Sequence, residues 1–152
     1  MTQIDPQQFA EHFRANVRFP NHIGLTVESV EAGRAVLSVE VGDIHMNGAE
    51  LVHGGVHASL MDTAMAVALI GMGLHAATTQ MNVYYLEPVT GGRLTCVGEV
   101  VHRSGRSATL EARVTNDQGK MVAMATGAFR IFSRPAVTQD ETEGNSESRG
   151  EG

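Results

Sequence analysis

The sequence has few cysteines, few charged residues and no long hydrophobic run. Among its 152 residues, Cys96 is the single cysteine, which excludes an intrachain disulfide framework and fits a reducing compartment. The longest apolar stretch, residues 64–74, is too short and too rich in alanine and glycine to cross a bilayer. Residues 1–19 are polar and lack the apolar core of a secretory signal. We therefore expect a cytoplasmic protein with no membrane partner.

The net charge and the length of the chain exclude further classes of protein. The net charge is −6, but several of the acids lie within residues 140–151, and the remainder is close to neutral. Nucleic-acid-binding domains usually carry a basic surface, so we expect no nucleic-acid partner. The length corresponds to one domain with a hydrophobic core.

Hydrophobic periodicity predicts the order of helices and strands. Asp5 and Pro6 are typical of a helix start, and Pro20 is expected to end this N-terminal helix, assigned to residues 1–20. Residues 21–134 form the predicted main domain, and residues 135–152 lack apolar periodicity and are predicted to be a disordered acidic tail. The main domain has a predicted helix from 54 to about 69, and predicted strands at 25–30, 35–41, 78–86, 94–102, 107–115 and 121–132.

This order predicts an α+β fold, in which one antiparallel sheet wraps a long central helix and the last four strands form a meander. Residues 56–69 of that helix look apolar on every side, which is typical of a buried helix. Because the sheet can cover only one side, we expect a second copy of the chain to cover the rest.

Asp62 is the unusual residue of this helix. A carboxylate on a buried helix is costly unless it is paired or hydrogen-bonded. It follows His53-Gly54-Gly55, a glycine-opened helix start whose free backbone N–H groups can receive developing negative charge. Asp62 alone is better explained by a structural hydrogen bond, and Asn47 alone could serve only the turn before Gly48. We favour a catalytic role for Asp62 because of its context.

Three segments together resemble the phenylacetate-pathway-type (PaaI-like) acyl-CoA thioesterases of the hotdog superfamily. They are Asn47 followed by His53-Gly54-Gly55 and Asp62, the strand Met81-Asn82-Val83-Tyr84-Tyr85-Leu86-Glu87-Pro88, and the hairpin Val101-His102-Arg103-Ser104-Gly105-Arg106. The resemblance covers roughly residues 24–132 and implies the hotdog fold and hydrolysis of acyl-CoA thioesters. It also implies a homodimer, assembled further into a homotetramer.

The resemblance also implies roles for residues. The Gly54 N–H matches the group that polarises the thioester carbonyl, Asn47 helps to bind that carbonyl, and Asp62 matches the catalytic base or nucleophile. Thr78, or Thr79 if the shorter helix–strand link shifts the match, positions the nucleophile. The substrate-binding set is His53 and Gly55 at the turn, with Arg103, Ser104, Gly105 and Arg106 near the phosphates of CoA. No metal or redox cofactor is implied.

Helix geometry constrains how Gly54 and Asp62 act. The eight residues between them span roughly 12 Å at 1.5 Å per residue. One carbonyl and its attacking water cannot be served by both groups at that distance. If both act on one substrate, they come from different subunits, with antiparallel helices across a two-fold axis.

Other interpretations stay open. His53 is a candidate base, although we favour a role in fixing the turn. His53 and His57 are spaced as a metal pair, but no third ligand has fitting spacing, because His45 and His75 lie in other segments. The alternative functions are a non-catalytic acyl-CoA-binding domain and an acyl-thioester dehydratase. The acyl group is not specified: aryl and medium-chain acyl groups both fit.

Overall fold

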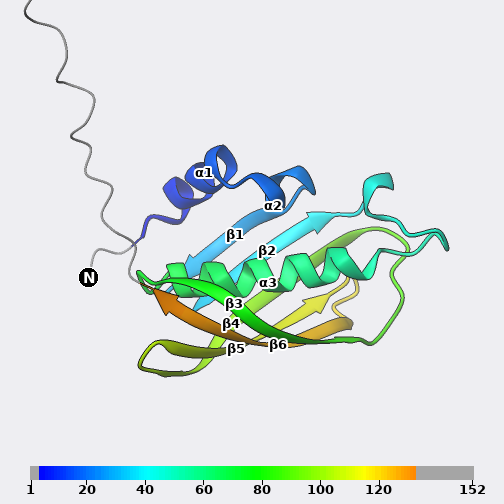
Figure 1. Cartoon of the computed structure of the whole chain (residues 1–152). Coiled ribbons are helices and arrows are strands. Elements are labelled where there is room, and N and C mark those ends of the chain that lie inside the picture. The colour runs from blue at the N-terminus through cyan, green and yellow to red at the C-terminus, as the bar shows by residue number, and fades with distance from the viewer. Residues whose placement is uncertain (1–3, 133–152) are drawn as a thin grey trace, which may run out of the picture.

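The computed structural model describes residues 4–132. The chain order is two short helices, a strand pair, the central helix and four strands (Figure 1). The elements are α1 (Pro6–Asn16), α2 (Arg18–His22), β1 (Thr26–Glu31), β2 (Arg34–Glu40), the 3₁₀ turn η1 (Asp43–His45), α3 (Gly54–Ile70), β3 (His75–Tyr85), β4 (Arg93–Ser104), β5 (Ser107–Thr115) and β6 (Met121–Phe132). The predicted tail at 135–152 lies outside the described residues.

The six strands form one antiparallel sheet in the order β1-β2-β4-β5-β6-β3. The α+β class and the single sheet are therefore confirmed, but the predicted four-strand meander is wrong. Of the last four strands, only β4, β5 and β6 are consecutive neighbours, whereas β3 pairs with β6 at the sheet edge and β4 pairs with β2. The segment 86–92 carries the chain from one edge into the middle of the sheet. Strand pairing is non-local, so hydrophobic alternation alone does not reveal this crossover.

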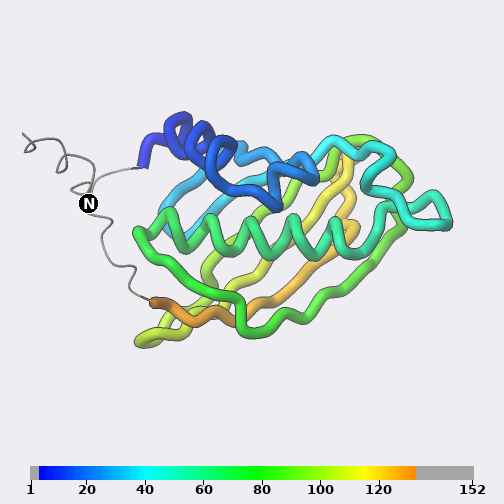
Figure 2. Tube along the Cα trace, turned by 45° about the horizontal axis from the view of Figure 1, so that its top comes forward, coloured from blue at the N-terminus to red at the C-terminus, as the bar shows by residue number. Residues whose placement is uncertain are grey.

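Helix α3 lies lengthwise along one face of the sheet (Figures 1 and 2). Gly98 on β4 permits this close approach, because an added Cβ would lie 2.6 Å from the carbonyl carbon of Ala64. Cys96 is buried in the core, and burial raises the pKa of its thiol to about 12, so the thiol is unreactive at neutral pH. The fully buried face of α3 comprises Leu60, Met61, Ala64, Met65, Ala68 and Leu69.

The opposite face of α3 is half-exposed within the single chain, and its burial by a second copy of the chain stays a prediction. Apart from Ile70, this face carries small or polar residues, and Asp62 among them is half-buried: Ala58, Ser59, Asp62, Thr63 and Ala66. The sequence pattern does not reveal this face, because alanines count as apolar residues although they have little apolar surface to bury.

The N-terminal region contains two helices instead of one. The Asp5 side chain accepts a hydrogen bond from the N–H of Gln7 at the predicted start of α1. The helix ends at Asn16, before the expected stop, and the Asn21 amide donates to the carbonyls of Phe13 and Val17 beyond this end. Pro20 lies within α2, in the first turn, where its missing N–H costs no hydrogen bond.

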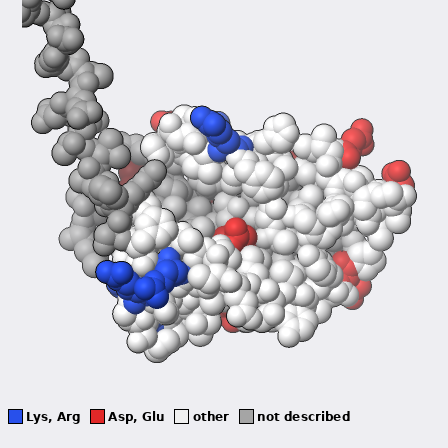
Figure 3. Space-filling view, viewed as in Figure 1, with Lys and Arg blue, Asp and Glu red and all other residues white. Residues whose placement is uncertain are grey.

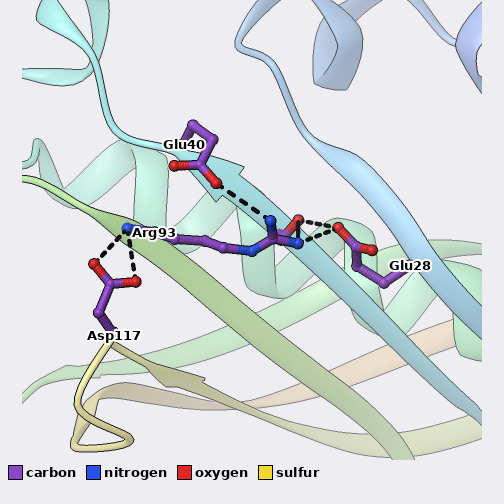
Figure 4. A network of polar contacts seen from close by, with 5 residues as sticks. Glu28, Glu40, Arg93 and Asp117 are labelled. Atoms are coloured by element: carbon purple, nitrogen blue, oxygen red, sulfur yellow. Dashed lines mark hydrogen bonds and ion pairs between the residues drawn. The ribbon is translucent and has the colours of Figure 1, made fainter.

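A polar network joins the neighbouring strands β1, β2 and β4 (Figure 4). The Arg93 guanidinium contacts Glu28 on β1 and Glu40 on β2, and its backbone N–H lies 3.1 Å from an Asp117 oxygen. Ser38, which is buried, also bonds to Glu28 and Arg93. The charged partners are partly exposed, so the ion pairs contribute little free energy individually. The network fixes strand register at this end of the sheet.

Candidate active site

The loop before α3 is organised by Asn47. Its side-chain oxygen accepts hydrogen bonds from the N–H groups of Ala49 at 2.8 Å and Leu51 at 3.1 Å. This turn holds Glu50 at a φ of 59°, in the left-handed region that non-glycine residues seldom adopt. Because Oδ1 is occupied by backbone donors, the amide NH₂ group of Asn47 remains a donor. The turn role and the carbonyl-binding role are therefore compatible.

His53 caps the N-terminus of α3. Its Nδ1 accepts a hydrogen bond from the Gly55 N–H at 2.8 Å, and its carbonyl accepts from the Val56 N–H at 2.9 Å. The favoured interpretation of His53, that it fixes the turn, agrees with this geometry. Within residues 4–132 no hydrogen bond satisfies the Gly54 N–H. The first turn therefore offers Gly54 as its free donor, whereas the Gly55 N–H is already used.

Tyr85, at the end of β3, packs directly against Gly54. Its hydroxyl donates to the Gly54 carbonyl at 3.0 Å. A Cβ added at Gly54 would lie 3.1–3.2 Å from the atoms of the Tyr85 ring, so glycine allows this close contact. The prediction of site residues did not include Tyr85. Strand alternation could have found it, because Tyr85 pairs with buried Ala123 and so shares the face that meets α3.

A cavity of about 250 Å³ opens beside this helix start. Asn47, Gly54 and Tyr85 line it, together with His57 from the next turn of α3. His57 is 4% exposed, and its ring meets the Tyr85 ring edge-on with centroids 6.0 Å apart. Burial lowers the pKa of His57, so its imidazole is neutral at neutral pH.

Asp62 lies beside a second hollow, of about 430 Å³, between the half-exposed face of α3 and β3. The Thr78 hydroxyl donates to the Asp62 carboxylate at 2.6 Å. The Thr79 hydroxyl instead donates to the Ala128 carbonyl at 3.0 Å. A β-bulge between Thr78 and Gln80 accompanies this divergence of adjacent hydroxyls. Of the two threonines considered from the sequence, Thr78 is the one that contacts Asp62.

The two hollows share no lining residue. We call Asn47, Gly54 and Tyr85, which line the first, the donor half-site. We call Asp62 and Thr78, which line the second, the acid half-site. The chain therefore keeps the two candidate catalytic groups apart, as the helix spacing predicts.

The basic hairpin also lies far from the donor half-site. Val100 and Ala68 each bond to the backbone of Gly33, which places this part of β4 beside the last turns of α3. The β4–β5 hairpin extends beyond that end, whereas Gly54 begins the helix (Figure 1). Figure 3 shows basic side chains gathered at the hairpin end and several acids at the opposite end. The exposed arginines there are Arg103, Arg106 and Arg130; the sequence analysis did not include the last.

The described residues offer little for two other classes of site. Residues 4–132 contain no group of three His, Cys, Asp or Glu side chains arranged to hold a metal. The Nδ1 of His53 already accepts a hydrogen bond from the Gly55 N–H. The His53 side chain is exposed whereas His57 is buried, so the two do not form a metal pair. None of the helices within residues 4–132 is long and apolar enough to cross a membrane.

Known proteins are similar to this chain in sequence and in fold. The model of the thioesterase superfamily matches residues 49–123. The acyl-coenzyme A thioesterase PaaI of Escherichia coli is 32% identical over 106 residues, which are 69% of this chain and 76% of that protein. The solved structure of E. coli PaaI, from the phenylacetic acid degradation operon, has a TM-score of 0.78 at 29% identity, covering 84% of this chain and 93% of that one.

A hypothetical thioesterase from Streptococcus pneumoniae, solved with coenzyme A, is also similar. Its TM-score is 0.69 at 27% identity, and the match covers 71% of this chain and 88% of that protein. The matched region of the superfamily model includes the helix that carries Gly54 and Asp62, and the strand that carries Thr78 and Tyr85.

Proposed function

We propose how this site works from the premise that the chain belongs to the thioesterase superfamily and is a PaaI-like acyl-CoA thioesterase with the hotdog fold. The overall reaction converts an acyl-CoA and water into a free acid and CoA. The observation that carries the proposed mechanism is the division of the donor and the acid between two separate hollows of one chain.

The donor half-site stabilises the thioester oxygen. The free Gly54 N–H, at the positive end of the α3 dipole, donates to the carbonyl oxygen as it gains negative charge. The Asn47 amide NH₂ supplies a second donor, because its oxygen is held by the loop. The Tyr85 hydroxyl holds the Gly54 carbonyl and thereby orients the neighbouring backbone.

The acid half-site activates the attacking group. In the general-base route, Asp62 takes a proton from water as the water oxygen bonds to the carbonyl carbon; the C–S bond then breaks and the CoA thiolate leaves. In the nucleophile route, the Asp62 carboxylate attacks the carbonyl carbon, the C–S bond breaks and the CoA thiolate leaves. Water then attacks the Asp62 carboxyl carbon of the resulting anhydride and releases the free acid. Thr78 holds one Asp62 oxygen in either route. A single turnover in heavy-oxygen water separates them, because only the nucleophile route transfers the isotope into Asp62.

A homodimer unites the two half-sites. Two α3 helices packed antiparallel, with the two-fold axis near Ala58, place Gly54 of one chain opposite the partner's Asp62. The small residues of the half-exposed α3 face allow close approach, and the outer edge of β3 has no strand partner within residues 4–132. An unpaired edge is a ready site for pairing with a second chain. We propose two composite sites per dimer, and a homotetramer made from two dimers; the cytoplasmic location stays a prediction.

The same arrangement brings a basic hairpin to each donor half-site. In one chain, 17 residues of α3 separate the Gly54 end from the hairpin end. In the antiparallel pair, the partner's helix continues past Gly54 toward the partner's hairpin. The partner's Arg103 and the partner's Arg106 then lie on the correct side to meet the CoA phosphates, for which the planar guanidinium is suited.

The first test measures thiol release from a panel of aryl- and alkyl-CoA thioesters. We expect Asp62→Asn to lower kcat by about 100- to 10,000-fold, the usual contribution of a general base, because the amide cannot take a proton. Thr79→Val is the matched control, since its hydroxyl bonds to Ala128 and not to Asp62. Binding of CoA thioesters without turnover by the native protein would instead support a binding domain, and equal turnover in Asp62→Asn would refute the role of Asp62.

A hybrid dimer tests the composite site. One chain carries Asp62→Asn and the other Gly54→Pro, each with its own affinity tag, and the doubly tagged species is purified after co-expression. If each site takes its donor and its acid from different chains, the hybrid contains one intact site and recovers about half of the native rate per dimer. If each site lies within one chain, the hybrid is as inactive as its parents.

A further inference from the structure

His45 is a buried side chain at the base of the loop that leads to Gly54. It is 4% exposed, and both of its ring nitrogens are hydrogen-bonded to backbone groups. Nδ1 accepts from the Gly42 N–H at 2.9 Å, so this nitrogen carries no proton. The Nε2–H donates to the Ile23 carbonyl at 2.6 Å. A neutral imidazole in one tautomer therefore joins two segments of backbone.

The loop between η1 and α3 returns to the backbone of His45. The His53 N–H donates to the His45 carbonyl at 2.8 Å, and Met46 and Val52 form an antiparallel bridge next to this bond. Gly54, which carries the free donor, directly follows His53 in the sequence. The place at which His45 is held therefore constrains the direction in which the Gly54 N–H points.

The bond from His45 to Ile23 ties this loop to the N-terminal region. In the described part of the chain, the other hydrogen bonds made by side chains of residues 42–53 stay within the loop and the first turn of α3. Ile23 lies in the turn after α2, where the Leu25 N–H donates to the Pro20 carbonyl at 2.9 Å. The imidazole of His45 is thus anchored on a turn that its own hydrogen bonds hold in place.

We propose that His45 is a positioning residue for thioester hydrolysis: by tying the loop to the turn after α2, its imidazole holds the Gly54 N–H in the direction that the oxyanion requires. The inference rests on the proposed function and deepens it, because it gives a role in catalysis to the turn before β1, which lies outside the residues 49–123 matched by the superfamily model. An oxyanion donor acts fully only when it is oriented before the reaction, and a small displacement removes much of its effect.

Steady-state kinetics on the best thioester of the panel test the proposal. His45→Leu removes both hydrogen bonds of the ring. We expect its kcat to fall by about tenfold, while KM changes by less than about twofold, because the Gly54 donor acts on the transition state. His45→Gln keeps a side chain that can accept from the Gly42 N–H, as glutamine does in a capping box, and should recover part of the rate.

Two combined variants separate positioning from a general loss of structure. With Gly54→Pro the donor is already absent, so adding His45→Leu should lower kcat by less than about twofold. With Thr78→Val, which alters the other half-site, His45→Leu should still lower kcat by about tenfold. Ser38→Ala is the matched control, because Ser38 is also 4% exposed and makes two hydrogen bonds, but on β2. It should lower the melting temperature and leave kcat native.

The outcomes of these measurements are distinct. A native kcat in folded His45→Leu, or an equal further loss in both combined variants, overturns the role of His45. A thermal melt of each variant establishes folding; if His45→Leu does not fold, the same two combinations are measured with His45→Gln, and the same two results decide. Failure of the native protein to hydrolyse any thioester refutes the proposed function itself.

Discussion

The two half-sites of this chain differ in how completely the chain itself orders them. The donor half-site is held by a network: Asn47 is bonded to its own loop, His53 caps the helix, and Tyr85 clamps Gly54. Within residues 4–132, the carboxylate of the acid half-site accepts one hydrogen bond, from Thr78, on the half-exposed face of α3. One chain thus preorganises the groups that receive charge, whereas it leaves the acid open to a second chain.

This difference has a physical basis. Oxyanion donors stabilise a transition state only when they are already oriented before the reaction, so they need a rigid local scaffold. A base or nucleophile must contact the substrate directly, and it needs an accessible face. Local loop and cap geometry can supply the first requirement, whereas the second is met by joining two chains.

The strongest test of the difference between the two half-sites is to remove the Gly54 N–H donor itself. Gly54→Pro deletes the N–H, and the backbone accepts proline because His53 is extended, with φ −60° and ψ 136°, and proline is favoured at the first helical position. We expect kcat to fall by about 100- to 1,000-fold, the usual cost of one oxyanion donor. Steady-state kinetics on the best thioester of the panel provide the measurement.

Gly54→Ala is the matched control for that experiment. It adds a Cβ at the same place, 3.1–3.2 Å from the Tyr85 ring, but retains the N–H. We expect it to be the much more active of the two variants. Equal losses in both variants would mean that crowding against Tyr85, and not loss of the donor, causes the effect.

Removing the one contact of the acid half-site should have the next largest effect. Thr78→Val deletes the hydroxyl that bonds to the Asp62 carboxylate, and a hydrogen bond to a charged group contributes about 1.5–3 kcal/mol, or about 10- to 100-fold in rate. Thr78→Ser should recover most of the rate. Thr79→Val, next to it, should leave kcat close to native; a larger loss there would reverse the assignment of the two hydroxyls.

Removing the hydrogen bond from Tyr85 to Gly54 in the donor half-site should lower kcat less. Tyr85→Phe retains the ring against Gly54 and removes only the hydroxyl that bonds to the Gly54 carbonyl. A neutral hydrogen bond contributes about 0.5–1.5 kcal/mol, so we expect kcat to fall by about two- to tenfold. Because Tyr85 acts by orienting the Gly54 N–H, which Gly54→Pro deletes, Tyr85→Phe combined with Gly54→Pro should be little slower than Gly54→Pro alone. Additive losses in the double variant would assign Tyr85 an independent role.

The smallest effect is on stability and its pH dependence. Burial holds the pKa of His57 below its ordinary value of 6.5. As the pH falls below 6.5, the unfolded chain binds a proton that the folded chain does not, so this histidine lowers the free energy of unfolding in acid. His57→Leu removes that contribution. Denaturant titrations at pH 8 and pH 5 should therefore show a larger gain for the variant at pH 5; equal gains would mean that His57 titrates normally.

Several features of the site were readable from local sequence. The glycine-opened helix start, the lone acid on an otherwise apolar helix and the eight-residue spacing all follow from short-range geometry. The resemblance of three segments to PaaI-like thioesterases was confirmed by the similarity of the chain to the thioesterase superfamily and to E. coli PaaI. Asn47 was recognised for a family role, but its bonds to Ala49 and Leu51, which free its NH₂ group, required coordinates.

Other features depend on which strands and side chains meet in space. The choice between Thr78 and Thr79 was decided by their hydrogen-bond partners beside a bulge, and a one-residue shift reverses the faces of a strand. The burial of His57 and its contact with Tyr85 join residues 28 positions apart in the sequence. No local pattern distinguishes such a histidine from a surface one.

By itself, the sequence determined the α+β class, the order of the elements, the thioesterase family and the positions of Gly54 and Asp62, because these depend on periodicity and on motifs within short segments. Only the tertiary structure decided that β3 pairs with β6 at an open edge, that α3 has one half-exposed face, and that the donor and the acid lie in separate hollows. Those features arise from contacts between distant segments, whose free energies depend on the whole packed sheet and not on any one stretch of chain.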